Sequence, residues 1–301
     1  VDDALKILDQ FLDGQKFVAG PNLTIADLSI VATVSSFEAS DIDFKKYANV
    51  KRWYETVKTS APGYQDANEK GLDAVFPTVQ CPAMPGPIDL YHVPGSAPCR
   101  AVLLAARALN VNLNLKAVDL YNGEHLKPEY LKINPQHTVP TLVDDGLSIW
   151  ESRAIMAYLV NKYGKGSSLY PEEPRARALV DQRLYFDIGT LHQRFGDYFY
   201  PQIFGGAPAD KEKLEKVDDA LKFLDQFLDG QKFVAGPNLT IADLSIVATV
   251  SSFEATDIDF KKYVNIKRWY ETVKSSAPGY QDANEKGLDA FKALVNSRLK
   301  K

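Results

Sequence analysis

The sequence predicts a mixed α/β domain of about 80 residues followed by an all-α domain, with a separate helical fragment in front of both. Three observations support this organisation. Short strands alternate with helices over residues 88–166, and helical periodicity continues without a strand pattern after Pro174. In addition, residues 1–74 recur almost verbatim as residues 217–290. A chain of 301 residues is long enough to bury a substantial core.

The first domain is predicted from the order of its short apolar runs. Strands and helices are expected at Ile88–Val93, Ala97–Asn110, Leu115–Leu120, Lys127–Lys132, Val139–Asp144, Ser148–Trp150 and Glu151–Tyr163. The last two strands form a hairpin across Asp145-Gly146, a dipeptide that favours a tight turn. A βαβ unit followed by ββα is the order of a thioredoxin-like domain, which we assign to residues 88–166.

The second domain, residues 174–301, has the periodicity of helices interrupted by Gly, Pro and Asn. One helix start is explicit in the sequence. Thr240 is placed to cap the helix that follows it, and Asp243, three residues later, is placed to return a hydrogen bond. We therefore expect an all-α domain here.

The repeat is one long segment, not a solenoid. Residues 1–74 and 217–290 differ at five positions, all conservative: Ile7/Phe223, Ser40/Thr256, Ala48/Val264, Val50/Ile266 and Thr59/Ser275. A solenoid would show several shorter and more diverged repeats. The pattern indicates a recent partial duplication, so residues 1–74 are expected to be an orphan piece of the C-terminal helical domain.

The two copies diverge abruptly after residue 74. Residues 75–87 contain four prolines and cannot form a helix interior, so they are expected to be a linker. Met84, within this segment, resembles the start of a complete protein. We hypothesise that residues 1–83 are the tail of a duplicated neighbouring copy fused upstream.

Composition excludes several classes of protein. The formal net charge is −4 and no dense Lys/Arg block occurs, so a nucleic-acid partner is not expected. No apolar run reaches about 18 residues, and the start of the sequence does not resemble a signal peptide. Two cysteines, Cys81 and Cys99, fit a reducing compartment, and the four histidines lack metal-ligand spacing. The expected class is a cytoplasmic α/β or α+β protein of the size of an enzyme.

The segment Tyr91–Arg100 contains the first candidate for chemistry. Gly95 permits a tight turn after the strand, and Ser96 lies where the helix begins. A hydroxyl at a helix N-terminus can stabilise an anion such as a thiolate, although Ser96 could also be a simple cap. Ser96-Ala97-Pro98-Cys99 is also a Cys-x-x-Cys pattern that has lost its attacking cysteine, and Cys99 is expected to be buried, which disfavours disulfide exchange.

Two further segments complete the candidate site. In Asn134–Val143, Pro140 begins a strand. The likeness to a thioredoxin-like domain implies that this proline is cis and turns the Val139 backbone toward a peptide-like ligand. In Trp150–Ile155 a strand gives way to a helix, where the Ser152 hydroxyl and free amides suit a carboxylate. Glu151 could pair with an ammonium group. Two structural alternatives remain: His137 could be an ordinary surface histidine, and Ser152 could simply cap the helix.

The order and spacing of these segments resemble the cytosolic glutathione transferases, and the insect delta class in particular. Ser96 is followed by His-x-Val-Pro about 41 residues later and by Glu-Ser-Arg about 12 residues after Val139. Pro94–Arg100, Gly123–Leu126 and Asn134–Pro140 carry the likeness to the delta class. It extends over residues 84–301 without a gap and covers residues 1–74 as an isolated piece.

The resemblance implies a catalytic role for Ser96, which would hold glutathione as its thiolate for attack on hydrophobic electrophiles. The glutathione-binding residues would be His125, His137, Val139, Pro140, Glu151, Ser152 and Arg153, and the hydrophobic substrate would lie near His192, Tyr200 and Phe204. His192 departs from the class, which often has tyrosine there. Other aromatic residues of this stretch (Tyr185, Phe195, Tyr198 and Phe199) are expected in the core.

The resemblance also implies glutathione as cosubstrate with no metal or other cofactor, a homodimer formed through residues 84–301, and a role in detoxification, including insecticide metabolism. The alternative is a non-catalytic binding or structural descendant of the fold.

The fragment, residues 1–74, has apolar side chains that need a packing partner: Ile7, Leu8, Phe11, Leu12 and Leu28. The fragment could therefore be a poorly packed appendage, dock on a dimer surface or displace residues 217–290. It has no equivalent of Ser96, His137 or Ser152.

Overall fold

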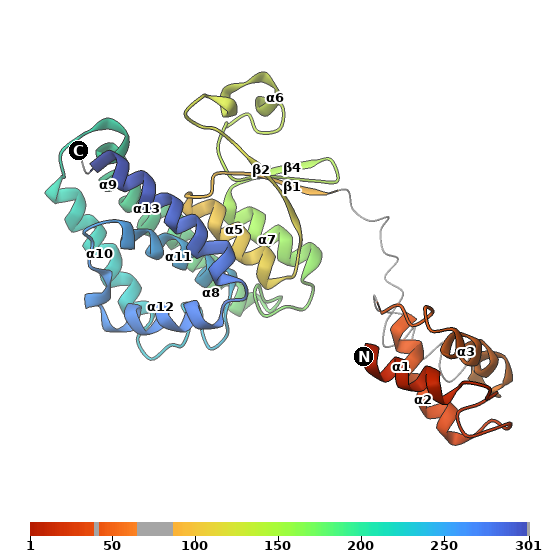
Figure 1. The fold of residues 1–301 in the computed structure, drawn as a ribbon. Helices are drawn as coiled ribbons and strands as arrows, with labels where there is room; N and C mark the ends of the chain where they lie inside the picture. Colours follow the sequence, from red (N-terminus) through yellow and green to blue (C-terminus); the bar gives the residue numbers. More distant parts are fainter. Residues whose placement is uncertain (39–41, 65–86, 300–301) are drawn as a thin grey trace. The chain divides into compact units, whose positions relative to one another are not determined.

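The computed structural model describes residues 1–38, 42–64 and 87–299 (Figure 1). The chain divides into two compact units, Val1–Met84 and Pro85–Lys301, which we call unit 1 and unit 2. Most of the predicted linker, residues 75–87, lies outside the described residues. None of the described helices is long and apolar enough to cross a membrane.

Unit 2 begins with a four-stranded sheet in the order β2-β1-β3-β4. The strands are β1 (Ile88–His92), β2 (Leu113–Ala117), β3 (Thr141–Asp144) and β4 (Leu147–Trp150). β1 and β2 are parallel, whereas β3 is antiparallel to both β1 and β4. This mixed sheet confirms the predicted thioredoxin-like fold.

One strand lies earlier in the chain than predicted. The expected strand Leu115–Leu120 is observed at Leu113–Ala117, because β2 pairs in register with β1 from Ile88 to His92 and β1 ends there. The hairpin turn is as predicted: Asp145 and Gly146 both have positive φ, 51° and 80°, as a tight two-residue connection requires.

Helices α5 (Ala97–Ala108) and α7 (Ser152–Tyr163) lie side by side beneath the sheet in Figure 1. The segment between β2 and β3 contains two short pieces, η2 (Glu124–Leu126) and α6 (Pro128–Leu131). Buried apolar residues of α5 and α7 pack with Leu90 of β1 and Leu142 of β3 into one core. Because α5 follows β1 and α7 follows β4 in the chain, both helices start at the edge of the sheet where these strands end.

The rest of unit 2 is helical, as predicted. Its elements are α8 (Pro174–Phe186), η3 (Asp187–His192), α9 (Gln193–Gly205), α10 (Lys211–Phe227), α11 (Ile241–Ser252), η4 (Phe253–Ala255), η5 (Phe260–Lys262), α12 (Val264–Ser276), η6 (Gln281–Glu285) and α13 (Lys286–Leu299). Every residue of α11 is buried, since α5, α7, α8, α12 and α13 all pack against it. Thr240 and Asp243 make the predicted capping interaction at its start.

Unit 1 folds around its own small core. Its helices are α1 (Asp2–Phe11), α2 (Ile25–Glu38) and α3 (Ala48–Ser60). Leu12 is fully buried within this unit, so the expectation that it needs an outside partner is wrong. Leu28 on α2 is 45% exposed, whereas its counterpart on α11, Leu244, is 0% exposed. Of the helices that cover α11, only α12 has a counterpart among the described residues of unit 1, namely α3; α5, α7, α8 and α13 have none there.

Candidate active site

Three predicted segments meet at one edge of the sheet because of its strand pairing. Tyr91 of β1 is paired with Thr141 of β3, and Thr141 is paired with Trp150 of β4. The chain leaves β1 toward Ser96, enters β3 from Val139-Pro140 and leaves β4 toward Glu151-Ser152. Antiparallel pairing places these junctions at the same edge, although up to 56 residues of sequence separate them.

Ser96 is the N-cap residue of α5, as predicted. It is half-buried, and its Oγ accepts a long hydrogen bond of 3.5 Å from the Cys99 backbone N–H. That bond leaves the hydroxyl proton free to be donated to a ligand. The positive end of the α5 dipole faces the same place, so the site favours an anion.

Cys99 does not offer a rival chemistry. Its side chain is 0% exposed, and burial raises the pKa of its thiol to about 11. At neutral pH the sulfur is therefore a protonated thiol, which is a poor nucleophile. The structure supports the expectation of a buried, unreactive cysteine.

The second segment is held by buried polar groups. The Val139–Pro140 peptide bond is cis, as predicted from the fold. The Tyr130 hydroxyl and the Asn134 side-chain amide donate hydrogen bonds of 2.6 and 3.0 Å to the Thr138 carbonyl oxygen. This loop therefore presents the Val139 backbone from a fixed position.

The two histidines of the candidate site lie near each other on separate loops. The ring centroids of His125, in η2, and His137 are 6.1 Å apart. His137 is exposed and His125 is half-buried. The two rings are therefore close enough for one small group to lie between them.

At the start of α7, Glu151 and Ser152 occupy contrasting environments. Glu151 is exposed and has a φ of 69°, which is unusual for a residue with a side chain. Ser152 is 2% exposed. Because the Ser152 Oγ accepts a 3.0 Å hydrogen bond from Arg153 Nη1, its proton is free to be donated.

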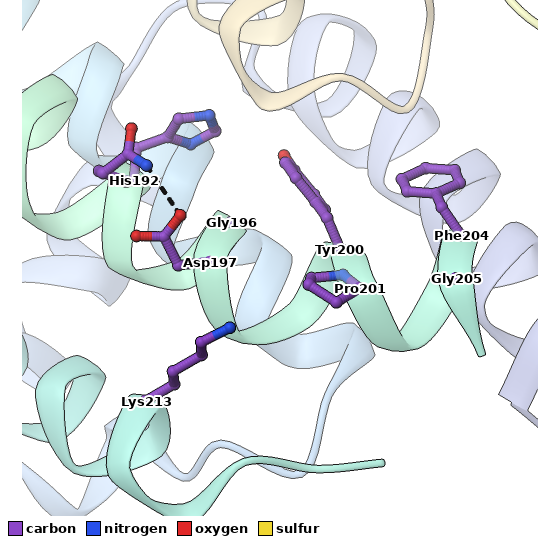
Figure 2. A pocket seen from close by; sticks show the side chains of 9 residues that line it. His192, Gly196, Asp197, Tyr200, Pro201, Phe204, Gly205 and Lys213 are labelled. Carbon is purple, nitrogen blue, oxygen red and sulfur yellow. Dashed lines mark hydrogen bonds between the residues drawn. The ribbon is translucent and has the colours of Figure 1, made fainter. Parts of the chain in front are cut away.

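A pocket of about 620 Å³ is formed along α9 (Figure 2). It is lined by His192, Gln193, Gly196, Asp197, Tyr200, Pro201, Phe204, Gly205 and Lys213. The rings of His192 and Tyr200 are 6.5 Å apart, and those of Tyr200 and Phe204 are 5.9 Å apart. Figure 2 shows the rings of His192, at the end of η3, and of Tyr200 and Phe204, on α9, on one side, with Lys213 on the other side. The pocket thus combines an aromatic wall with a polar one.

Comparison with known proteins identifies the family. Residues 90–169 match the model of the glutathione S-transferase N-terminal domain, and residues 1–61 and 190–277 match that of the C-terminal domain. The chain belongs to the glutathione S-transferase family. The double match of the C-terminal model agrees with the repeat seen in the sequence.

Solved insect glutathione transferases are similar to this chain. A delta-class enzyme of Nilaparvata lugens is 58% identical, with a TM-score of 0.69; the match covers 70% of this chain and 100% of that one. A Bombyx mori glutathione transferase is 48% identical, covering 70% and 99%, with a TM-score of 0.68. An epsilon-class enzyme of Musca domestica is 44% identical, covering 70% and 98%, with a TM-score of 0.67.

In this glutathione transferase, Arg153 connects the start of α7 to the helical domain. Its Nη2 donates a 2.5 Å hydrogen bond to Oδ2 of Asp187, which is 0% exposed. Asp187 also accepts hydrogen bonds from Ser245 and Thr249 of α11. Burial alone would raise the pKa of Asp187, but these partners and the neighbouring charges hold it below its ordinary value. Asp187 is therefore an ionised anchor for Arg153.

The aromatic residues around the pocket divide between wall and core. Phe195 and Phe199 are 1% and 3% exposed and belong to the core, as predicted. Tyr185, in contrast, is 74% exposed, so its assignment to the core is wrong. Tyr185 lies near the end of α8, on a face that the described helices leave open.

Sequence reasoning missed two buried charged residues of this glutathione transferase. Asp187 has no local motif, since its partners Ser245 and Thr249 lie 58 and 62 residues away in the sequence. Arg100 ends the Pro94–Arg100 segment and is 0% exposed. An arginine in an otherwise apolar helix face was the one signal that could have marked it.

Proposed function

We propose that this glutathione transferase conjugates the glutathione thiolate to hydrophobic electrophiles and that Ser96 is the catalytic residue. The observation that supports this most directly is the strand pairing that gathers Ser96, Val139 and Ser152 at one sheet edge, at the N-termini of two helices. A tripeptide thiol with two carboxylates and one ammonium group suits that set of donors and acceptors.

In the proposed site, the Ser96 hydroxyl donates to the glutathione sulfur. A hydrogen bond to the ionised form lowers the pKa of the bound thiol from its ordinary value near 8.5, and the α5 N-terminus acts in the same direction. Deprotonation gives the thiolate, whose sulfur lone pair attacks an electrophilic carbon of the second substrate. The leaving group departs with its bonding electrons, so the electron balance needs no redox partner.

The backbone of glutathione is proposed to lie along the sheet edge. Val139, which precedes Pro140 in a loop held by Tyr130 and Asn134, pairs with it as an added strand would. His125 and His137 bind the glycyl carboxylate. Ser152, positioned by Arg153, binds the γ-glutamyl carboxylate, and Glu151 binds its ammonium group.

The electrophile is proposed to occupy the α9 pocket against Tyr200 and Phe204. His192 lies in the same wall, and burial lowers the pKa of its imidazole to about 4, with Arg153 adding to the effect. His192 is therefore neutral at pH 7 and offers a polar but uncharged surface. That favours neutral, apolar electrophiles, as expected for a detoxification enzyme that includes insecticides among its substrates.

Unit 2 is proposed to act as a cytoplasmic homodimer. We propose that unit 1, together with residues 75–87 as a linker, is a partial copy of the helical domain (residues 174–301) that carries no glutathione site of its own. The near-identity of residues 1–74 to 217–290 and the match of residues 1–61 to the C-terminal domain model support this.

The test is a conjugation assay on the full chain with glutathione and 1-chloro-2,4-dinitrobenzene. Ser96→Ala is expected to lower kcat/KM about a hundredfold, the scale of losing one donor to a developing or bound anion. Ser297→Ala, an exposed helix serine, is the matched control and should retain full activity. Equal rates for Ser96→Ala and the unchanged chain would reject Ser96. Glutathione binding without turnover would favour the non-catalytic carrier.

A further inference from the structure

Arg100 is a buried cation in the first turns of the helix that begins at Ser96. Its backbone N–H donates a 3.0 Å hydrogen bond to the Ser96 carbonyl oxygen. Its side chain is 0% exposed and points into the helical domain, where its partners lie. Arginine is rarely fully buried unless it is paired with a carboxylate.

All partners of the Arg100 guanidinium are neutral. Nη1 donates to the Ser251 Oγ at 2.7 Å and to the Asn284 Oδ1 at 2.5 Å, and Nη2 donates to the Ser252 Oγ at 2.6 Å. Nε has no partner among the described residues. The described part of the chain places no carboxylate within ion-pair distance of Arg100, so its positive charge is not neutralised locally.

The charge persists at neutral pH. Burial lowers the pKa of Arg100 only to about 10, so the guanidinium stays protonated at pH 7. Its charge acts on the wall of the α9 pocket, since Arg100 contributes to lowering the pKa of His192 and opposes the burial-driven rise in the pKa of Tyr200. Both residues line the α9 pocket.

The position of Arg100 is fixed by close packing. A Cβ atom at Gly287 would lie 2.6 Å from the Arg100 Cδ and 2.4 Å from the Pro94 carbonyl oxygen. A Cβ atom at Gly95 would lie 3.3 Å from the Phe291 backbone nitrogen. The start of α13 therefore presses directly on both Arg100 and the turn before Ser96.

We propose that Arg100 is a positioning residue whose uncompensated charge stabilises the thiolate held by Ser96. The proposal rests on the proposed function. A fixed positive charge close to the α5 N-terminus adds to the helix dipole and the Ser96 hydroxyl, and low surrounding polarity keeps it effective. The hydroxyl and amide partners serve this role better than a carboxylate would, because they satisfy the donors without cancelling the charge.

Within the described part of the chain, titratable and charged groups on several elements face Arg100. They are Cys99 on α5, Tyr200 on α9, Tyr270 on α12, Tyr280 before η6, and, toward the pocket, His192 and Arg153. Burial raises the pKa values of the cysteine and the three tyrosines, and burial lowers that of His192. These five groups stay neutral between pH 6 and 9, so none of them masks a shift in the glutathione thiol.

The experiment neutralises the charge in two independent ways in the full chain. Asn284→Asp places a carboxylate beside the guanidinium and keeps the oxygen that accepts from Arg100, although it loses the 3.2 Å hydrogen bond that the Asn284 amide donates to the Ser251 Oγ. Arg100→Gln removes the cation. Arg100→Lys keeps the charge. The readout is the pH dependence of kcat/KM with 1-chloro-2,4-dinitrobenzene, supported by the ultraviolet absorbance of bound glutathione thiolate.

Asn284→Asp and Arg100→Gln are expected to raise the apparent pKa of bound glutathione by about one unit, which lowers the thiolate fraction at pH 6.5 up to tenfold. Arg100→Lys should stay near the parent value. An unshifted pKa in a folded, active Asn284→Asp protein would overturn the proposal, as would an equal shift in Arg100→Lys. If Arg100→Gln fails to fold, Asn284→Asp decides alone.

Ser96→Ala is assayed beside these variants. If activity does not depend on Ser96, the proposed function fails. If activity depends on Ser96 but the pKa of bound glutathione does not change with the charge at position 100, only the proposed role of Arg100 is rejected.

Discussion

Asp243 and Asp27 offer a matched test of which helical unit supports activity. Asp243 accepts hydrogen bonds from the Val234 N–H at 2.8 Å, from the Thr240 N–H and hydroxyl at 2.9 Å, and from the Trp269 indole N–H at 2.9 Å. Asp27 accepts the equivalent four bonds in unit 1, at 2.8 to 2.9 Å. Alanine at either position removes the same acceptor from two nearly identical sequences.

The cost of Asp243→Ala follows from its stranded donors. Trp269 is 0% exposed and Val234 is 2% exposed, so neither N–H can turn to water. Two unsatisfied buried donors at about 1–3 kcal/mol each, plus about 1 kcal/mol for the lost helix cap, give roughly 3–7 kcal/mol. Removing the carboxylate also removes the cost of burying its charge, which offsets part of this loss; that cost is seen in the raised pKa of Asp243, which burial causes. We expect a net loss of about 4 kcal/mol.

The assay is the temperature at which half of the conjugation activity is lost irreversibly on fixed-time heating. For a unit of this size, about 4 kcal/mol corresponds to a decrease of roughly 8–16 °C in Asp243→Ala. Asp27→Ala should leave that temperature unchanged, because its stranded donors lie in unit 1. If Asp27→Ala lowers it as much as Asp243→Ala does, the reasoning that activity resides in unit 2 is refuted.

Three other predictions follow from the same structure. Gly287→Ala should cost about 2–4 kcal/mol of stability, because its Cβ would lie 2.4 Å from the Pro94 carbonyl oxygen, whereas Gly189→Ala, with no atom within 4 Å of the new Cβ, should be neutral in thermal denaturation. The pKa of His192 falls to about 4 in the folded state, so its stabilising effect is complete above the unfolded value near 6.5 and is lost as pH falls toward 4. His192→Gln should therefore reduce the loss of stability between pH 6.5 and 4 by up to about 3 kcal/mol, seen as a shallower decline in melting temperature, and an unaltered slope would contradict this. Finally, removing residues 1–83 should leave kcat and KM within about twofold of the full chain in the conjugation assay, because every proposed site residue and its partners lie in unit 2; a larger fall would show that unit 1 contributes to the site.

Local features of the fold and of the site were predictable from the sequence. Ser96 caps α5 and Asp243 bonds to Thr240 because turn and capping interactions join residues within about four positions of each other. The order of strands and helices was also predictable, because apolar periodicity is a local property of the sequence. The boundary of β2 was less predictable, since pairing with β1 sets where it ends.

The buried charges were decided by tertiary structure. Arg100 finds Ser251 and Asn284 at sequence separations of 151 and 184 residues, and Asp187 reaches α11 from 58 residues away. No local pattern encodes such a partner, because burial and pairing depend on which elements pack together. Leu28 and Leu244 illustrate the limit. Their flanking sequences are identical, yet one is 45% exposed and the other 0%, because only α11 is covered by α5 and its neighbours.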